Sequence, residues 1–237
     1  MLNKAVILAG GKGTRMGHLT ADLPKQLIPV NGRPFAFYLL NNLAQAGFTD
    51  IIIVIGYKKE KWADFLKTLE WNVRIVDQNE RVSDKYGTAC PVEATEPEVG
   101  QDNFIAVNGD NLYSPSDLKA MRHQDDLNYV TCFRSEHPEL YGVLEADDNG
   151  LLKKIHERSP SPPTNMTNAG LYKFTPKIFE AIKNIGLSPR GEYEITDAIS
   201  WLAQQHLVKI QELKDYWYDF GKPEDIKIVE EFLKTQD

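Results

Sequence analysis

The hydrophobic residues in the first half of the chain form short continuous runs that are separated by amphipathic segments. Residues 4–9, "KAVILA", are an apolar run that ends at a glycine, and residues 50–57, "DIIIVIGY", are another, as is typical of buried strands. Between them, residues 34–47 begin with proline and end with glycine, as helices often do. Further strands are predicted over 72–76 and 103–110, and a further helix over 58–69. This alternation predicts a parallel sheet with helices on both faces.

The pattern changes after residue 127, where strand-like segments follow one another without intervening helices. Residues 141–147 and 151–157 are joined by "DDNG", a strong hairpin signal. Other short strands are predicted over 128–133, 168–174, 208–214 and 217–220, with a helix inside 190–205 and a closing helix over 223–236. The segment 159–164, "SPSPPT", predicts an extended, exposed loop. Because the chain has no repeat and no long linker, residues 1–237 are predicted to form one mixed α/β domain.

Composition narrows the classes of function. With 237 residues, of which 42% are hydrophobic, the chain can bury a sizeable core. Its formal net charge of -7 argues against binding to nucleic acid or to an anionic membrane surface, so a phosphate ligand would need a local basic site. No apolar run has the length of a signal peptide or membrane helix, and a cytoplasmic protein is expected. Cys90 and Cys132 are too few for a thiolate zinc site and are predicted to be buried free thiols.

The stretch "ILAGGKGTRMG", residues 7–17, places glycines, a lysine and an arginine directly after the first predicted strand. At the carboxyl edge of a parallel sheet, such a loop offers backbone N–H groups that a phosphate can approach closely. It is not a dinucleotide fingerprint, because Met16 stands where the third glycine of GxGxxG belongs, and no GK pair is followed by Ser or Thr. A plain strand-to-helix turn is the alternative interpretation. Arg15 and Lys25 together favour a clamp on a polyphosphate.

Two stretches, "LAGGKGTRM" at 8–16 and "PKQLIPVNGRP" at 24–34, resemble the signature of the sugar-1-phosphate nucleotidyltransferases. That signature is LAGGxGTRL followed by a Pro-Lys motif, and here Met16 replaces its last leucine. Further stretches follow in the order found in the family: "GT" at 87–88, "VNGD" at 107–110, "YGVL" at 141–144, Glu157, "NAGLYKF" at 168–174, "EYEITDAI" at 192–199 and "WYDFGKPED" at 217–225. The resemblance to this family, typified by glucose-1-phosphate thymidylyl- and uridylyltransferases, therefore extends over nearly the whole chain.

The resemblance implies both a fold and a reaction. The fold is Rossmann-like, with a mixed, mostly parallel central sheet, helices on both faces and added antiparallel sugar-binding strands. Residues 1–127 would mainly bind the nucleotide and residues 128–237 mainly the sugar. The phosphate of a sugar 1-phosphate would attack the α-phosphorus of a nucleoside triphosphate in line, which releases pyrophosphate and forms an NDP-sugar. Mg²⁺ is the implied cofactor, the two substrates are the implied partners, and homo-oligomers are common in the family.

The resemblance also implies roles on the nucleotide side. The opening loop would wrap the nucleotide through Leu8, Ala9, Gly10, Gly11, Gly13 and Thr14, and the base would meet Gln78, Gly87 and Thr88. Arg15 would hold the leaving pyrophosphate, and Lys25 would contact the phosphates undergoing transfer. Asp110 and Asp219 would bind the metal, and Asp110 would also be catalytic. The alternatives for these two residues are a turn aspartate and an ordinary loop aspartate.

On the sugar side, the resemblance implies Glu157 as an acceptor for sugar hydroxyls, with Gly142 and Asn168 in the same pocket. Arg158 stands where the family has a lysine on the sugar phosphate, which retains the charge but changes the geometry. Glu192 is a weaker candidate, because a carboxylate at a helix start explains it almost equally well. The histidines have no metal-ligand spacing and receive no catalytic role: His18, His123, His137, His156 and His206.

The sequence leaves the base and the sugar open. Glucose 1-phosphate with UTP or dTTP is favoured, while CTP, GTP, and N-acetylhexosamine, mannose or heptose phosphates remain alternatives. A metal-dependent glycosyltransferase is disfavoured because Asp110 begins no Asp-x-Asp motif, and "YGVLE" favours a sugar over phosphocholine. A non-catalytic nucleotide-sugar sensor would be expected to lose Arg15, Lys25 or Asp110. The family's bifunctional members carry a C-terminal repeat domain that this sequence lacks, so acetyl transfer is not expected.

Overall fold

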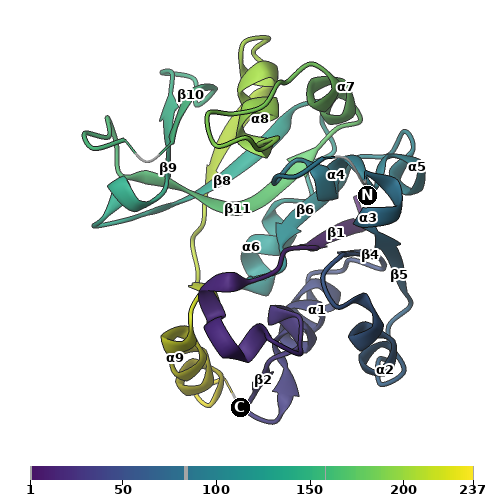
Figure 1. The fold of residues 1–237 in the computed structure, drawn as a ribbon. Coiled ribbons are helices and arrows are strands. Elements are labelled where there is room, and N and C mark those ends of the chain that lie inside the picture. Colours follow the sequence, from purple (N-terminus) through teal and green to yellow (C-terminus); the bar gives the residue numbers. More distant parts are fainter. Residues whose placement is uncertain (1, 83–84, 158, 237) are drawn as a thin grey trace.

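A large central sheet organises the computed structural model, which describes residues 2–82, 85–157 and 159–236. Its parallel part has the order β6-β1-β4-β5 and is built by the apolar runs of the first half of the chain (Figure 1). The strands are β1 (Lys4–Ala9), β4 (Asp50–Ile55), β5 (Val73–Asp77) and β6 (Phe104–Asn108). The predicted parallel strands are therefore confirmed.

Antiparallel strands extend this sheet on the side of β6. The strand β11 (Met166–Phe174) pairs with β6 and carries β8 (Asn128–Arg134) and the hairpin of β9 (Gly142–Ala146) and β10 (Leu152–Glu157). The pairing of β11 with β8 is irregular between Asn168 and Tyr172. A parallel strand, β12 (Val208–Glu212), closes this end against β8. The mixed sheet that the second half of the sequence predicts is thus confirmed.

Helices cover both faces of the sheet, and the alternation of side chains along β1 divides the core between them. Val6 packs on one face with α4 (Cys90–Glu93), α7 (Lys177–Lys183) and α8 (Ile195–Ala203). Ala5 and Ile7 pack on the other with α1 (Phe35–Gln45), α2 (Trp62–Leu66) and α6 (Pro115–Ala120). Because successive strand residues point to opposite faces, an unbroken apolar run is what such a buried strand requires. Both cysteines are buried and free, as predicted.

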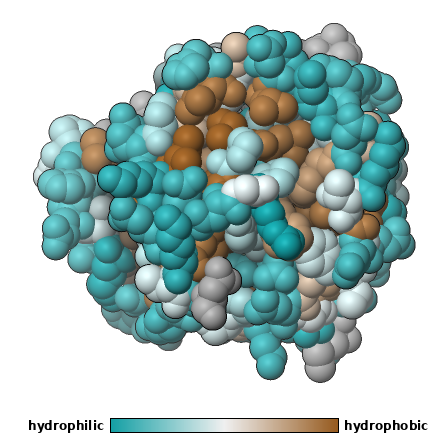
Figure 2. Space-filling view, turned by 90° about the horizontal axis from the view of Figure 1, so that it is seen from below, coloured by the Kyte–Doolittle hydropathy of each residue, from teal (hydrophilic) through white to brown (hydrophobic). Residues whose placement is uncertain are grey.

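A third apolar cluster, below the sheet in Figure 1, joins the loop after β1 to the end of the chain. Phe35 stacks on Phe220 with ring centroids 4.2 Å apart, and Met16 and Val229 belong to the same cluster. The elements that meet there and elsewhere outside the sheet are η1 (Thr14–Thr20), η2 (Lys25–Leu27), β2 (Pro29–Val30), β3 (Arg33–Pro34), η3 (Lys59–Lys61), α3 (Gln78–Arg81), α5 (Glu96–Val99), β7 (Asn111–Tyr113), η4 (Pro138–Leu140), β13 (Trp217–Asp219) and α9 (Pro223–Leu233). Seen from below, hydrophilic side chains ring an area where hydrophobic ones gather (Figure 2).

The structure differs from the predicted helices in two ways. The helix expected over 58–69 is divided into η3 and the short α2, and Lys58 before it has a left-handed backbone with φ 52°. The short helices α3, α4, α5, α6 and α7 were not predicted, because each is too short to show a full amphipathic period. The side chain of Ser114 starts α6 by accepting the amide of Asp117 at 3.1 Å. Among the described residues, no helix has the length and apolar character needed to cross a membrane.

Lys173, in the middle of β11, gives a test of this packing. Its side chain is fully buried, and Nζ donates to the carbonyl oxygens of Asp125 and Leu127, each at 2.5 Å. We expect Lys173→Met to lower the free energy of unfolding by about 1–3 kcal/mol, because two carbonyls lose their buried donor. In urea unfolding, the exposed Lys183→Met is the control and should change stability by less than about 0.5 kcal/mol. Equal effects of the two substitutions would contradict this interpretation.

Candidate active site

A pocket of about 290 Å³ opens at the carboxyl ends of β1 and β6, under the antiparallel strands. Arg15 and Asp110 enter its wall from the loops after these two strands, while Glu157 comes from the end of β10. Ligand sites of open α/β sheets lie at this edge, in the crevice outside the carboxyl ends of the strands. The wall includes the following residues proposed from the sequence: Arg15, Thr88, Asp110, Gly142, Glu157, Asn168 and Asp219.

Asp219 reaches Asp110 through a short two-stranded sheet. In the antiparallel pair of β13 and β7, Asp219 lies opposite Asn111, and the amide of Phe220 donates to the carbonyl oxygen of Asp110 at 2.8 Å. The Asn111 side chain also donates to Oδ1 of Asp219 at 3.2 Å. Burial, and then the negative charge of Asp110, raise the pKa of Asp219 above its ordinary value. Two carboxylates are therefore held together in a partly dehydrated wall.

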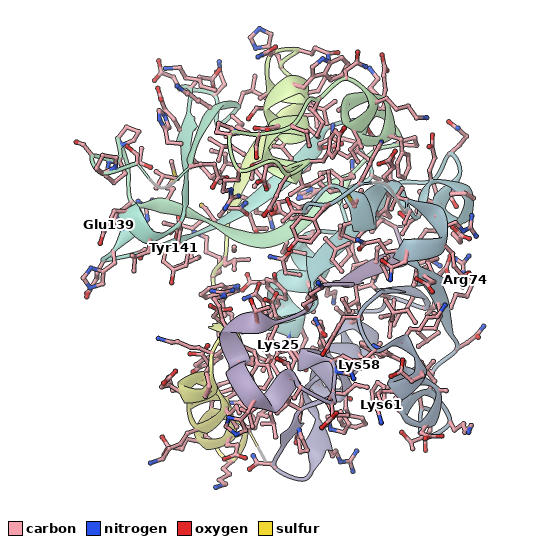
Figure 3. The ribbon with its side chains drawn as sticks, viewed as in Figure 1. Lys25, Lys58, Lys61, Arg74, Glu139 and Tyr141 are labelled. Atoms are coloured by element: carbon pink, nitrogen blue, oxygen red, sulfur yellow. The ribbon has the colours of Figure 1, made fainter. Side chains whose placement is uncertain are left out.

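Lys25 supplies a positive charge to this pair of carboxylates. It lies in η2, is only 5% exposed, and its Nζ forms an ion pair with Oδ2 of Asp110. The opening loop packs on it, because a Cβ on Gly13 would lie 3.0 Å from the Cβ of Lys25. Figure 3 shows Lys25 in the lower part of the molecule and Tyr141, which lines the pocket, above it. Lys25 itself does not line the pocket and contacts its wall through Asp110.

Arg15 lies beside Asp219 at the mouth of the same pocket. Gly221, two residues after Asp219, lies close to the side chains of both Asp219 and Arg15. A Cβ on Gly221 would lie 3.0 Å from Oδ2 of Asp219 and 3.3 Å from both terminal nitrogens of Arg15. The positive charge of Arg15 lowers the pKa of Asp219, against the larger effects of burial and Asp110. Arg15, Lys25 and the two aspartates together form one charged cluster.

The remaining residues of the opening loop lie next to the pocket and outside its wall. The carbonyl oxygen of Leu8 accepts the amide of Gly109 at 2.9 Å, which links the loop to the end of β6. Gln78 crosses over Gly10, where a Cβ would lie 2.3 Å from its Oε1. The structure does not bring these proposed residues into the pocket wall: Leu8, Ala9, Gly10, Gly11, Gly13, Thr14, Lys25, Gln78 and Gly87. The pocket wall therefore contains Arg15, the two aspartates, Gly142, Glu157 and Asn168, while the loop, Lys25 and Gln78 lie outside it.

The residues that the resemblance assigns to the sugar are positioned by the hairpin and by the irregular segment of β11. Gly142 pairs with Glu157, and a Cβ on Gly142 would lie 3.1 Å from Oε1 of that glutamate. Asn168 donates to the hydroxyl of Tyr172 at 2.9 Å and accepts the amide of Gly170 at 3.0 Å. Gly170 has φ 73°, and a Cβ there would lie 2.2 Å from Nδ2 of Asn108, so the turn requires glycine. Arg158 lies outside the described residues.

The comparison with protein families decides the kind of site. A family model described as nucleotidyl transferase matches residues 4–236. The chain belongs to this family. The resemblance inferred from the sequence motifs is thereby confirmed, and the observed sheet is the fold that it implies.

Three similar proteins illustrate the relationship. The Methanocaldococcus jannaschii bifunctional protein GlmU is 33% identical over 230 residues, which are 97% of this chain and 54% of that protein. The Haloferax volcanii UTP–glucose-1-phosphate uridylyltransferase AglF is 30% identical over 239 residues, 98% of this chain and 97% of that protein. A solved UDP-glucose pyrophosphorylase in complex with UDP-glucose shares the fold, with a TM-score of 0.88 at 23% identity and all of both chains covered. The chain spans about half the length of the first relatives that it matches.

Sequence reasoning missed several residues of the pocket wall, including Asn108, Asn111, Tyr141, Tyr172, Arg190, Glu194, Thr196 and Trp217. Glu192, the weaker candidate from the sequence, does not line the pocket, whereas Glu194, two residues later, does. The two lie two residues apart just before α8, so spacing alone does not separate them. Burial does, since Glu194 is only 4% exposed.

The carboxylate pair gives a test of the site's electrostatics. We expect Asp219→Asn to raise the melting temperature in metal-free buffer at pH 7, with a gain of about 0.5–2 kcal/mol, because it removes a dehydrated charge beside Asp110. The asparagine oxygen can still accept the hydrogen bond from Asn111. The exposed Asp64→Asn is the control and should leave the melting temperature unchanged. A lower melting temperature for Asp219→Asn would show that repulsion between Asp110 and Asp219 does not destabilise the folded protein.

Proposed function

We propose that the protein transfers a nucleotidyl group from a nucleoside triphosphate to a sugar 1-phosphate, with UTP or dTTP and glucose 1-phosphate as the favoured pair. One observation carries the proposal. Arg15, Asp110 and Asp219 share a single pocket with Gly142, Glu157 and Asn168, so a polyphosphate and a sugar can lie side by side. Family membership and the similarity to a uridylyltransferase over nearly the full length of both chains support the choice of UTP and glucose 1-phosphate.

The reaction needs positioning and charge neutralisation more than a protein nucleophile. A phosphate oxygen of the sugar 1-phosphate attacks the α-phosphorus, a new P–O bond forms, and the bond to the bridging oxygen of pyrophosphate breaks. We assign Arg15 to the departing pyrophosphate, since a guanidinium can take two phosphate oxygens at once. Lys25 neutralises the phosphates undergoing transfer. Both cations are held close to the carboxylates, which supports a compact charge cluster around the reacting phosphorus.

Mg²⁺ fits the residues that are present. Asp110 and Asp219 are hard oxygen ligands, and burial together with the negative charge of Asp110 raises the pKa of Asp219, an unfavourable effect that a bound cation would relieve. In the described part of the chain, no cluster of three or more acidic, histidine or cysteine side chains offers a complete metal site. The other ligands would then be phosphate oxygens and water, as is usual for Mg²⁺ with nucleotides. Bound there, the ion would neutralise the polyphosphate and orient it.

We assign the two ends of the substrate pair to the two sides of the pocket. On the nucleotide side are the loop residues Leu8, Ala9, Gly10, Gly11, Gly13 and Thr14, together with Gln78, Gly87 and Thr88. On the sugar side are Gly142, Glu157, Arg158 and Asn168. The carboxylate of Glu157 is suited to accept sugar hydroxyls. Residues 1–127 thus serve mainly the nucleotide and residues 128–237 mainly the sugar, in a cytoplasmic protein whose buried free thiols suit a reducing compartment.

The direct test is pyrophosphate release from a matrix of UTP, dTTP, CTP and GTP against glucose, N-acetylglucosamine and mannose 1-phosphates, with MgCl₂. We expect the highest kcat/KM with glucose 1-phosphate and UTP or dTTP, and no release when MgCl₂ is replaced by EDTA. Release from a different pair would reassign the substrates and keep the chemistry. No release from any pair would contradict the proposal and favour a nucleotide-sugar-binding regulator.

The role of Arg15 can be tested within η1. We expect Arg15→Ala to lower kcat by about 100–1,000-fold, because a donor to the departing charge is lost. The exposed His18 lies on the same short helix, and His18→Ala is the matched control, with kcat expected to be unchanged. Full activity in Arg15→Ala would remove the residue from the mechanism.

A further inference from the structure

Glu194 is a buried carboxylate whose two oxygens accept hydrogen bonds from residues on two different sides of the pocket. It is only 4% exposed and occupies the N-cap position of α8, but its side chain makes no capping hydrogen bond. Its Oε2 accepts the hydroxyl of Thr88 at 3.1 Å. Its Oε1 accepts Nε and Nη2 of Arg190 at 3.1 and 2.7 Å, and the hydroxyl of Ser188 at 3.3 Å. A single side chain therefore joins segments that lie more than a hundred residues apart.

The backbone next to Glu194 holds the same two segments together. The amide of Tyr193 donates to the carbonyl oxygen of Tyr86, and the amide of Ala89 donates to that of Tyr193, both at 2.9 Å. Gly87 lies between them with φ 139°, and a Cβ there would lie 2.2 Å from the carbonyl oxygen of Tyr193. Only glycine permits this approach. The "GT" stretch is thus held against the start of α8 by backbone hydrogen bonds and close packing.

Thr88 completes the link from the nucleotide side. Its hydroxyl oxygen accepts the amide of Ile195, the first residue of α8, at 2.9 Å while its proton goes to Glu194. Thr88 therefore does for α8 what an N-cap side chain normally does. A ligand that shifts Thr88 must alter both the helix start and the hydrogen bond to Glu194.

Arg190 is the other end of the link. Its loop turns at Ser188, whose carbonyl oxygen accepts the amide of Gly191 at 2.8 Å. The hydrogen bonds that Arg190 donates to Glu194 raise the pKa of Arg190 and hold its guanidinium in the pocket wall, on the side of Glu157. Without Glu194, this half-exposed side chain would have many rotamers to choose from.

We propose that Glu194 is a positioning residue that couples the two substrates: it ties Thr88, on the nucleotide side, to Arg190, on the side of the sugar phosphate. The inference rests on the proposed function, since it needs a pocket that takes two ligands. Binding of the triphosphate at Thr88 then orders Arg190 before the acceptor arrives. Glu194 touches neither reacting phosphate in this scheme and acts through its two partners.

A double-mutant cycle tests the coupling. We expect Glu194→Gln to raise KM for glucose 1-phosphate by about tenfold or more, because the charged partner of Arg190 is lost. Arg190→Gln should have a similar effect, and the double variant should be no worse than Arg190→Gln alone. Glu192→Gln, two residues away and outside the pocket wall, is the matched control and should leave both KM values unchanged. Losses that simply multiply, or a lower melting temperature with unchanged KM, would overturn the proposal.

Amide hydrogen exchange tests the link without turnover. With UTP and MgCl₂ added to the unsubstituted protein, we expect slower exchange both in residues 86–89 and in residues 186–193. In Glu194→Gln the slowing should be confined to residues 86–89. Equal slowing of both segments in the variant, or none in residues 186–193 of the unsubstituted protein, would overturn the coupling. Failure of the proposed function is a separate result, since it would appear as absent pyrophosphate release.

Discussion

The pairing of β13 with β7 is the contact on which the whole site depends. It carries Asp219 back to Asp110 across more than a hundred residues and fixes both by backbone hydrogen bonds as well as by Asn111. Bringing two carboxylates together in a partly buried wall is unfavourable by itself, as the raised pKa of Asp219 indicates. Lys25 and Arg15 offset that cost. The two cations therefore partly balance the repulsion between the carboxylates. The free energy of burying the apolar faces of the sheet offsets what remains of it.

Two further links make one pocket from two parts of the chain. The antiparallel pairing of β11 with β6 brings Asn168 to the same edge of the sheet as Asp110. The contact between residues 86–89 and the start of α8 joins the flank of the nucleotide loop to Arg190. Each link crosses between the segments that we assign to the nucleotide and those that we assign to the sugar, so a ligand on one side meets residues that are held by the other. In a two-substrate transfer, such links favour ordered assembly of the reacting groups.

Much of this could be predicted from the sequence, for identifiable physical reasons. Apolar runs ending in glycine, such as residues 4–9, show a buried strand directly, and Asp110 follows from its place after another such run. What the sequence could not show are pairings made by very short strands, since β7 and β13 have only three residues each. It also could not separate Glu192 from Glu194, because the difference lies in which one is buried. The burial of Lys173 inside an apolar strand could not be predicted either, because it depends on the contact with Asp125, which lies 48 residues earlier in the chain.

We propose that Asp110 and Asp219 hold a divalent cation directly beside the triphosphate. Paramagnetic relaxation of phosphorus-31 nuclei by Mn²⁺, in a complex with a non-hydrolysable UTP analogue, measures this most directly. We expect strong relaxation of the phosphorus signals of the bound analogue, and loss of that relaxation when both aspartates are changed to alanine. Mn²⁺ that binds far from the phosphates, or relaxation that persists in the double variant, would contradict it.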